Sequence, residues 1–166
     1  MITIFNEAWG EFDPDKLYDI VKPLAENKLI DTASGWHLAD KRDIYSIHSY
    51  TVPLRKREDT KLHKPYVLTE IGGASLVTDH FVYPKVFGHH VCKNVNELTQ
   101  RYQKLYQGLI PQIKNNELEG LIYTQLPDCE GEANGIYTSD RSLLKLDSAV
   151  IEGINKEISG IERSLK

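Results

Sequence analysis

The chain has 166 residues, 40% of them hydrophobic, and its 20 basic and 24 acidic side chains leave a formal net charge of −4. This weakly acidic balance gives no electrostatic reason to expect a nucleic-acid partner, and no apolar run approaches the roughly 18 residues of a membrane span. The first residues show neither a basic region nor a cleavage-like site, so we expect no signal peptide and, by default, a cytoplasmic location.

Five short apolar runs are predicted to be β-strands, at residues 2–7, 29–33, 43–48, 66–70 and 120–125. The first of these runs ends in Glu7 and the fourth ends in Glu70. Amphipathic helical patterns alternate with the apolar runs, and such alternation is typical of a parallel sheet. We therefore expect the five strands to share one parallel sheet, in a single domain that covers residues 1–166.

Three helices are expected around this sheet. Asp13 and Pro14 offer an N-cap and a proline at the first helical position. Asn94 opens a second helix with Glu97 as its capping partner, and the last helix begins near Ser148. Residues 71–93 are rich in Gly, His, Tyr and Phe without a clear period, so we expect a long functional loop there.

Side chains suited to chemistry stand at or just past the ends of these strands, namely Glu7, Trp36, His48, Glu70 and Gln125. The carboxyl ends of parallel strands lie at one edge of a sheet, where active groups gather. This shared placement predicts a functional site at that edge.

Two of these residues suit glycoside hydrolysis, which uses a pair of carboxyl groups that flank the scissile bond. One group donates a proton to the leaving oxygen, and the other attacks the anomeric carbon or activates water. Taken alone, a glutamate at a strand end is more often a salt-bridge or loop-capping residue. Glu7 and Glu70 are two such residues, each in an unusual local sequence, which makes this alternative less favoured for the pair.

Five segments, in order along the chain, carry a resemblance: Asn6-Glu-Ala-Trp-Gly10, residues 29–36, residues 43–50, Thr69-Glu-Ile-Gly-Gly73 and residues 123–141. They resemble segments on the fourth to eighth barrel strands of glycoside hydrolase family 2, the β-galactosidase and β-glucuronidase family. The sequence departs from the family at Ala8, where a small Gly is usual, and around Thr51. Tyr123 is the aromatic residue nearest to the family's strand-eight tryptophan.

The resemblance implies an α/β fold, an incomplete (β/α)₈ TIM barrel of about five parallel strands that correspond to strands 4 to 8. A complete barrel needs about 250 residues. It also implies retaining double-displacement hydrolysis of terminal β-glycosidic bonds without a cofactor, with Glu7 as acid/base and Glu70 as nucleophile. Sugar-binding roles then fall to Asn6, Trp9, Trp36, His48, Tyr50, Tyr123 and Gln125.

Other interpretations stay open. A non-catalytic or assembly-dependent half-barrel would keep the same segments and be inactive alone, and a different hydrolase could use a similar barrel. His80 and the pair His89-His90 invite a metal site, but no carboxylate or cysteine stands at a familiar spacing, so we expect none. Cys92 and Cys129 are expected to be unreactive thiols.

The expected partners are a β-glycoside substrate and a second copy of the chain, with no nucleic acid and no membrane. An incomplete barrel would leave two strand edges unpaired, at residues 2–5 and 121–125. Unpaired edges of a hydrophobic sheet favour association, so we expect a homodimer through these open edges.

Overall fold

The computed structural model describes residues 1–7, 10–50, 64–88 and 90–164. The chain divides into two compact units. The first unit holds Met1–Ser49, the strand from Tyr66 to Ile71, and Glu117–Ile122. The second holds Tyr50, Gly72–Asn116 and the chain from Tyr123 onward. Each unit is described by itself.

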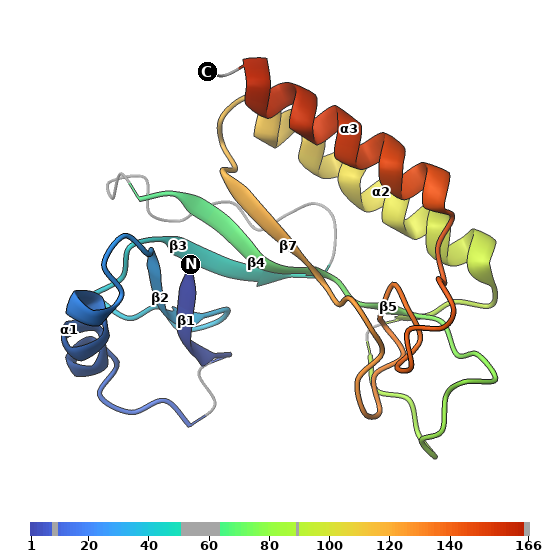
Figure 1. The fold of residues 1–166 in the computed structure, drawn as a ribbon, viewed down its shortest axis with the longest axis horizontal. Helices are drawn as coiled ribbons and strands as arrows, with labels where there is room; N and C mark the ends of the chain where they lie inside the picture. Colours follow the sequence, from blue (N-terminus) through green and yellow to red (C-terminus); the bar gives the residue numbers. More distant parts are fainter. Residues whose placement is uncertain (8–9, 51–63, 89, 165–166) are drawn as a thin grey trace. The chain divides into compact units, whose positions relative to one another are not determined.

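The five predicted strands are all present, with small changes at their ends (Figure 1). They are β1 (Ile2–Asn6), β2 (Ile30–Ser34), β3 (Tyr45–Ser49), β4 (Tyr66–Gly72) and β7 (Gly120–Thr124). The three predicted helices are α1 (Pro14–Leu24), α2 (Val95–Lys114) and α3 (Ser148–Ser164). The predicted positions of these elements are therefore confirmed, but Asp13, which precedes α1, makes no side-chain capping hydrogen bond.

The predicted incomplete barrel is wrong. In the described ranges the strands form three separate sheets, ordered β1-β2, β3-β4-β7 and β5-β6, where β5 is Ala74–Ser75 and β6 is His90–Val91. The pairs β1-β2, β3-β4 and β5-β6 are parallel. No five-stranded sheet joins them, so the chain is not a half-barrel. The pair β5 and β6 lies inside residues 71–93, which the sequence predicted to be a loop.

The break between the two larger sheets falls between β2 and β3. The N–H of Ile30 donates to Asp43 Oδ2 at 2.8 Å, and its carbonyl accepts from the N–H of Asp43 at 2.9 Å. The hydroxyl of Thr32 donates to the carbonyl of Lys41 at 2.6 Å. The segment that leads into β3 therefore hydrogen-bonds to backbone and side-chain groups of β2. In a continuous sheet, backbone groups of β2 would bond to β3 itself.

Asp43 also ties α1 to the β1-β2 sheet. Its carboxylate accepts from the Tyr18 hydroxyl at 2.7 Å and from Lys22 Nζ at 2.5 Å. The hydrogen bond to Asp43, followed by burial, raises the pKa of Tyr18 to about 12. Because the two donors come from successive turns of α1, this one carboxylate fixes both the position and the rotation of the helix.

In the second unit, α2 and α3 run side by side (Figure 1). The apolar side of α2 is buried at Leu98, Tyr102, Leu105 and Leu109, whereas Val95 in its first turn is exposed. Asn94 is its N-cap, and the Asn94 side chain accepts from the N–H of Glu97 at 2.9 Å. The predicted start of this helix is therefore confirmed at the level of its cap.

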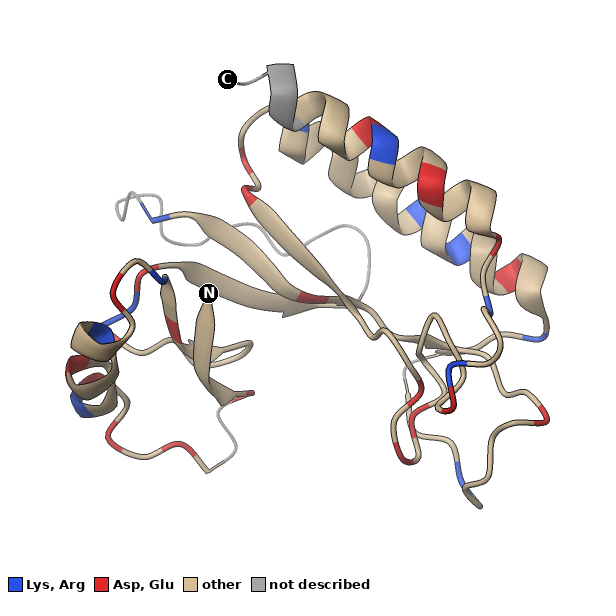
Figure 2. Cartoon of the chain, viewed as in Figure 1, with Lys and Arg blue, Asp and Glu red and all other residues tan. Residues whose placement is uncertain are grey.

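Both acidic and basic residues occur along α2 and α3 (Figure 2), and Lys114 of α2 pairs with Glu157 of α3 at 3.0 Å. None of the helices within the described ranges has the length and apolar character needed to cross a membrane. The expected association through open strand edges stays a prediction. Light scattering over a range of concentrations measures it, and a mass that stays at one chain would contradict it.

Candidate active site

Glu7, His48 and Glu70 come together in the first unit. The Nδ1 atom of His48 lies 3.4 Å from Glu7 Oε1 and 3.6 Å from Glu70 Oε2. One side-chain oxygen of each glutamate and a ring nitrogen of His48 all lie within 4.8 Å of one another. The His48 side chain is fully buried, whereas those of Glu7 and Glu70 are 34% and 21% exposed. Two carboxylates thus approach one buried imidazole from a side that solvent reaches.

The backbone conformation positions Glu7, His48 and Glu70 in this cluster. Glu7 follows the last residue of β1, and its N–H donates to the carbonyl of Ser34 at 3.0 Å. Its φ of +60° is a left-handed conformation, uncommon for a residue with a side chain. On the neighbouring sheet, His48 pairs with Glu70, and the β3-β4 register shifts between Ile47 and His48. Strained residues of this kind concentrate at functional sites.

Ser34 holds the histidine from the other side. Its Oγ donates to Asn6 Oδ1 at 2.8 Å and lies 3.3 Å from His48 Nε2. Because the Ser34 proton is used on Asn6, the Ser34 oxygen is placed to accept from the Nε2 side of the ring. The chain Asn6–Ser34–His48 therefore leaves Nδ1 directed at the two carboxylates. Ser34 was not predicted as a site residue.

A buried acidic residue, Asp31, lies near His48. Asp31 is completely buried in β2, and its Oδ1 accepts from the Ser46 hydroxyl at 2.7 Å. Among the described residues, its Oδ2 is buried without a hydrogen-bond partner. Burial raises the pKa of Asp31, while the hydrogen bond from Ser46 and the charge of His48 oppose that rise. All five residues of β2 are buried. An acidic residue inside such an apolar run could have marked Asp31 as a candidate site residue from the sequence.

Gly35 makes room for the His48 ring. A Cβ placed on Gly35 would lie 3.0 Å from His48 Nδ1 and 3.1 Å from its Cε1, and the glycine has a φ of +98°. A larger residue at position 35 is therefore destabilising for two reasons, backbone strain and displacement of the imidazole.

We expect Gly35→Ala to lower the free energy of unfolding by roughly 1–3 kcal/mol and to move His48 away from its position between the glutamates. Chemical denaturation measures the first effect, and the shift of the His48 ring signals in an NMR spectrum measures the second. Gly153→Ala is the matched control, because Gly153 lies in α3 with open space at its Cβ position. The control should be neutral or stabilising by up to about 1 kcal/mol, and equal destabilisation by both variants would contradict the role given to Gly35.

The other predicted sugar-binding residues are distributed over both units. Trp36 is 47% exposed and its ring meets the His48 ring edge-on at a centroid distance of 6.1 Å. It thus lies beside the Glu7–His48–Glu70 cluster and is partly exposed to solvent. Trp9 lies outside the described residues. Tyr50, half-buried, belongs to the second unit.

Tyr123 and Gln125, also in the second unit, have local partners of their own. The Tyr123 ring packs 5.2 Å from the Tyr102 ring and covers Gly72, where a Cβ would come within 2.4 Å of it. Burial, followed by the nearby Tyr102, raises the pKa of Tyr123. This packing makes Tyr123 part of an aromatic cluster with α2.

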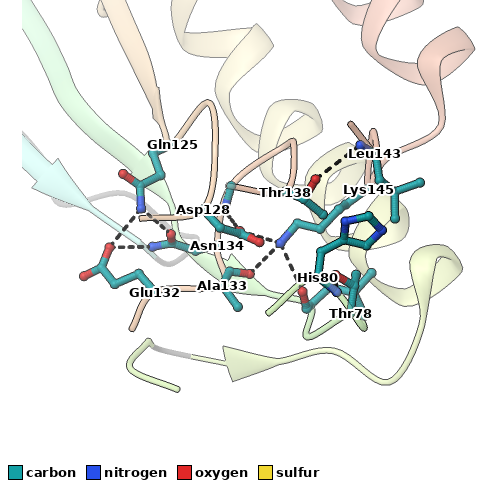
Figure 3. Close-up of polar contacts among 12 residues, drawn as sticks. Thr78, His80, Gln125, Asp128, Glu132, Ala133, Asn134, Thr138, Leu143 and Lys145 are labelled. Carbon is teal, nitrogen blue, oxygen red and sulfur yellow. Dashed lines mark hydrogen bonds and ion pairs between the residues drawn. The ribbon is translucent and has the colours of Figure 1, made fainter. Parts of the chain in front are cut away.

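Gln125 stands in a polar network (Figure 3). Its Nε2 donates to Asn134 Oδ1 at 2.7 Å and to Glu132 Oε2 at 3.1 Å, and Asn134 Nδ2 donates to the same Glu132 oxygen at 3.2 Å. A second network in the figure surrounds Lys145, which donates to Asp128 and to two backbone carbonyls. Both networks fix the chain that follows β7.

Neither the family models nor the curated proteins match this chain. Solved structures do. An exo-β-agarase matches with a TM-score of 0.59 and 15% identity, covering 90% of this chain and 22% of its own. The protein PfGH50B matches with a TM-score of 0.59 and 16% identity, covering 91% of this chain and 24% of its own.

These likenesses show a shared fold, and this chain spans less than a quarter of the length of either structure. Neither neighbour is described as a family 2 enzyme, so the finer resemblance to that family is not shown. The structural neighbours of this chain are, at the coarser level, glycoside hydrolases.

Proposed function

We propose that this chain carries the two-carboxylate centre of a retaining β-glycosidase, with Glu7 as acid/base and Glu70 as nucleophile. The observation that carries the proposal is the approach of both glutamates to His48 Nδ1, at 3.4 and 3.6 Å. Carboxyl groups are about 5–5.5 Å apart in retaining enzymes and about 6.5–9.5 Å apart in inverting ones. Side-chain oxygens within 4.8 Å of each other favour the retaining geometry.

The proposed chemistry has two steps. In the first, a carboxylate oxygen of Glu70 attacks the anomeric carbon while the bond to the leaving oxygen breaks and Glu7 gives that oxygen its proton. In the second, the Glu7 carboxylate takes a proton from water, the water oxygen attacks the same carbon, and the ester bond to Glu70 breaks. Glu7 ends protonated and Glu70 ionised, as both began.

His48 and Trp36 have supporting roles in this proposal. His48 places Nδ1 beside both carboxyl groups, at 3.4 and 3.6 Å, so the ring can hold the two groups in place as the proton of Glu7 leaves and returns. Trp36 offers an exposed aromatic surface of the kind that stacks on the apolar face of a sugar. The fold shared with an exo-β-agarase makes agar oligosaccharides, beside aryl β-galactosides and β-glucuronides, the first substrates to test.

A 2-deoxy-2-fluoro β-glycoside with an activated leaving group tests the proposal, because it accumulates the glycosyl-enzyme ester. We expect mass spectrometry of the digested chain to place the sugar on Glu70. NMR of the product from an ordinary aryl β-glycoside should show the β-anomer forming first. A label on another carboxylate, or an α-anomer as first product, would overturn the assignment.

A second candidate function is a non-catalytic or assembly-dependent role. It is favoured by the small share of each glycosidase neighbour that this chain covers, 22% and 24%. In that case the purified chain neither hydrolyses the substrates nor takes up the fluoro-sugar, but still binds a β-glycoside in isothermal titration calorimetry or gains activity with a partner chain.

A further inference from the structure

We propose that His90, Cys92 and Glu97 form a zinc-binding site in the second unit, separate from the Glu7–His48–Glu70 cluster. A nitrogen of His90, the sulfur of Cys92 and an oxygen of Glu97 all lie within 4.8 Å of one another. From the sequence alone no metal site is expected here, because no cysteine or carboxylate stands at a familiar spacing from the histidines. The fold supplies that spacing.

Strand and helix geometry bring the three ligands together. His90 lies in β6, and Cys92 follows two residues later, so their side chains point to the same side of the strand. The pairing of β6 with β5 continues at Cys92, whose N–H donates to the carbonyl of Ser75 at 2.7 Å. Glu97, in the first turn of α2, reaches back and accepts from the N–H of Lys93 at 2.9 Å. Cys92 and Glu97 are therefore each held by a hydrogen bond to the backbone, and His90 is held by its pairing with Ala74 of β5.

The chemistry of the set favours zinc among the common metals. Imidazole nitrogen, thiolate sulfur and carboxylate oxygen are all zinc ligands, whereas calcium and magnesium take oxygen alone. Bond lengths of about 2.0–2.3 Å place the ligand atoms of a tetrahedral zinc about 3.5 Å apart. His90 Nε2 and Glu97 Oε1 lie 2.9 Å apart as a hydrogen-bonded pair, so they need only open slightly to admit the ion.

The surroundings allow an ion to enter. The side chains of His90 and Glu97 are 41% and 30% exposed, which leaves a solvent-facing position for water as a fourth ligand. Cys92 lies behind them, only 4% exposed. Glu97 Oε2 accepts from the N–H of Lys93 at 2.9 Å, and Glu97 Oε1 lies 2.9 Å from His90 Nε2. Arg101 Nε lies 3.6 Å from the same oxygen, a long contact that the metal would replace.

Cobalt(II) titration of the chelator-treated chain tests the site. A cobalt–thiolate bond gives a near-ultraviolet charge-transfer band, which the Glu7–His48–Glu70 cluster cannot produce because it contains no sulfur. We expect a saturable band that one equivalent of zinc removes. Cys92→Ser should abolish the band, while Cys129→Ser, which removes the exposed cysteine, should keep it.

Glu97→Gln and His90→Gln keep Cys92 in place and should weaken zinc binding by more than tenfold, measured by competition with a zinc-sensitive dye. His80→Gln, a histidine that pairs with Asp140 elsewhere, is the control and should bind as the parent does. Helical circular dichroism verifies that each variant is folded. The absence of a band in the parent chain, or a band that survives in Cys92→Ser, would overturn the proposal.

Discussion

Replacing Glu70 by alanine is expected to lower kcat on an aryl β-glycoside by roughly 10⁴- to 10⁶-fold, the scale of removing a nucleophile from a hydrolase. In the proposed mechanism Glu70 attacks the anomeric carbon, and Glu7, the other carboxyl group of the cluster, acts as the proton donor. Added azide should restore turnover by taking the space that the side chain leaves. Because azide then attacks in a single step, the product should be the α-glycosyl azide.

Replacing Glu7 by alanine should give a different pattern with the same reagent. The loss should be roughly 10²- to 10⁴-fold for substrates whose leaving group needs a proton and small for a dinitrophenyl glycoside, whose leaving group does not. Azide should now intercept the ester on Glu70 and give the β-glycosyl azide. The exposed Glu152 of α3 provides the control, and Glu152→Gln should leave the rate unchanged. Azides of the same anomeric configuration from both variants would contradict the two separate roles.

Replacing Lys145 by methionine is expected to destabilise the second unit by roughly 3–5 kcal/mol, the cost of breaking a buried ion pair by removing one partner. Lys145 is fully buried, and its Nζ donates to Asp128 Oδ1 at 2.5 Å and to the carbonyls of Leu76 and Ala133 at 3.0 and 2.9 Å. Burial lowers the pKa of Lys145, and Asp128 opposes this shift. Without the ammonium group, the buried Asp128 carboxylate loses its counter-charge and keeps the N–H of Gly135 as a donor. The carbonyls of Leu76 and Ala133 each lose one hydrogen bond.

Chemical denaturation followed by tyrosine fluorescence measures this loss. Lys114→Met is the matched control, because Lys114 forms an exposed pair with Glu157 whose side chains are 53% and 47% exposed. Such surface pairs contribute less than about 1 kcal/mol. Adding Asp128→Asn to Lys145→Met should recover part of the lost stability, since it removes the unpaired charge. A cost for Lys145→Met as small as that of the control would contradict the role given to the buried pair.

The local elements could be predicted from the sequence because their signals are local. Strand runs such as residues 66–70 and the Asn94 cap of α2 depend on neighbouring residues, and the structure has them where they were expected. The sheet order could not be predicted in the same way. At the break between β2 and β3, Asp43 bonds the backbone of Ile30, and nothing in the local sequence pattern distinguishes such a contact from a strand pairing.

The candidate site, too, could be predicted from the sequence only in part. That Glu7 and Glu70 stand at strand ends was visible in the sequence, and the structure brings them together with His48. The supports of His48 were not visible, because Ser34 and Gly35 act through a hydrogen bond and a missing Cβ whose partners lie 14 and 13 residues away. The cluster of His90, Cys92 and Glu97 was missed for a related reason, since a turn into α2 folds Glu97 back over the strand.

The left-handed backbone of Glu7 has a consequence for how this sequence would drift over generations. A residue with a side chain in that conformation costs roughly 1–2 kcal/mol relative to glycine, and asparagine also tolerates it better than glutamate. A lineage that no longer needed the carboxylate would gain stability by exchanging it, whereas one that needs it must retain a residue that its own backbone disfavours. The residue found at position 7 among natural variants of this chain is thus a record of whether the group is still in use.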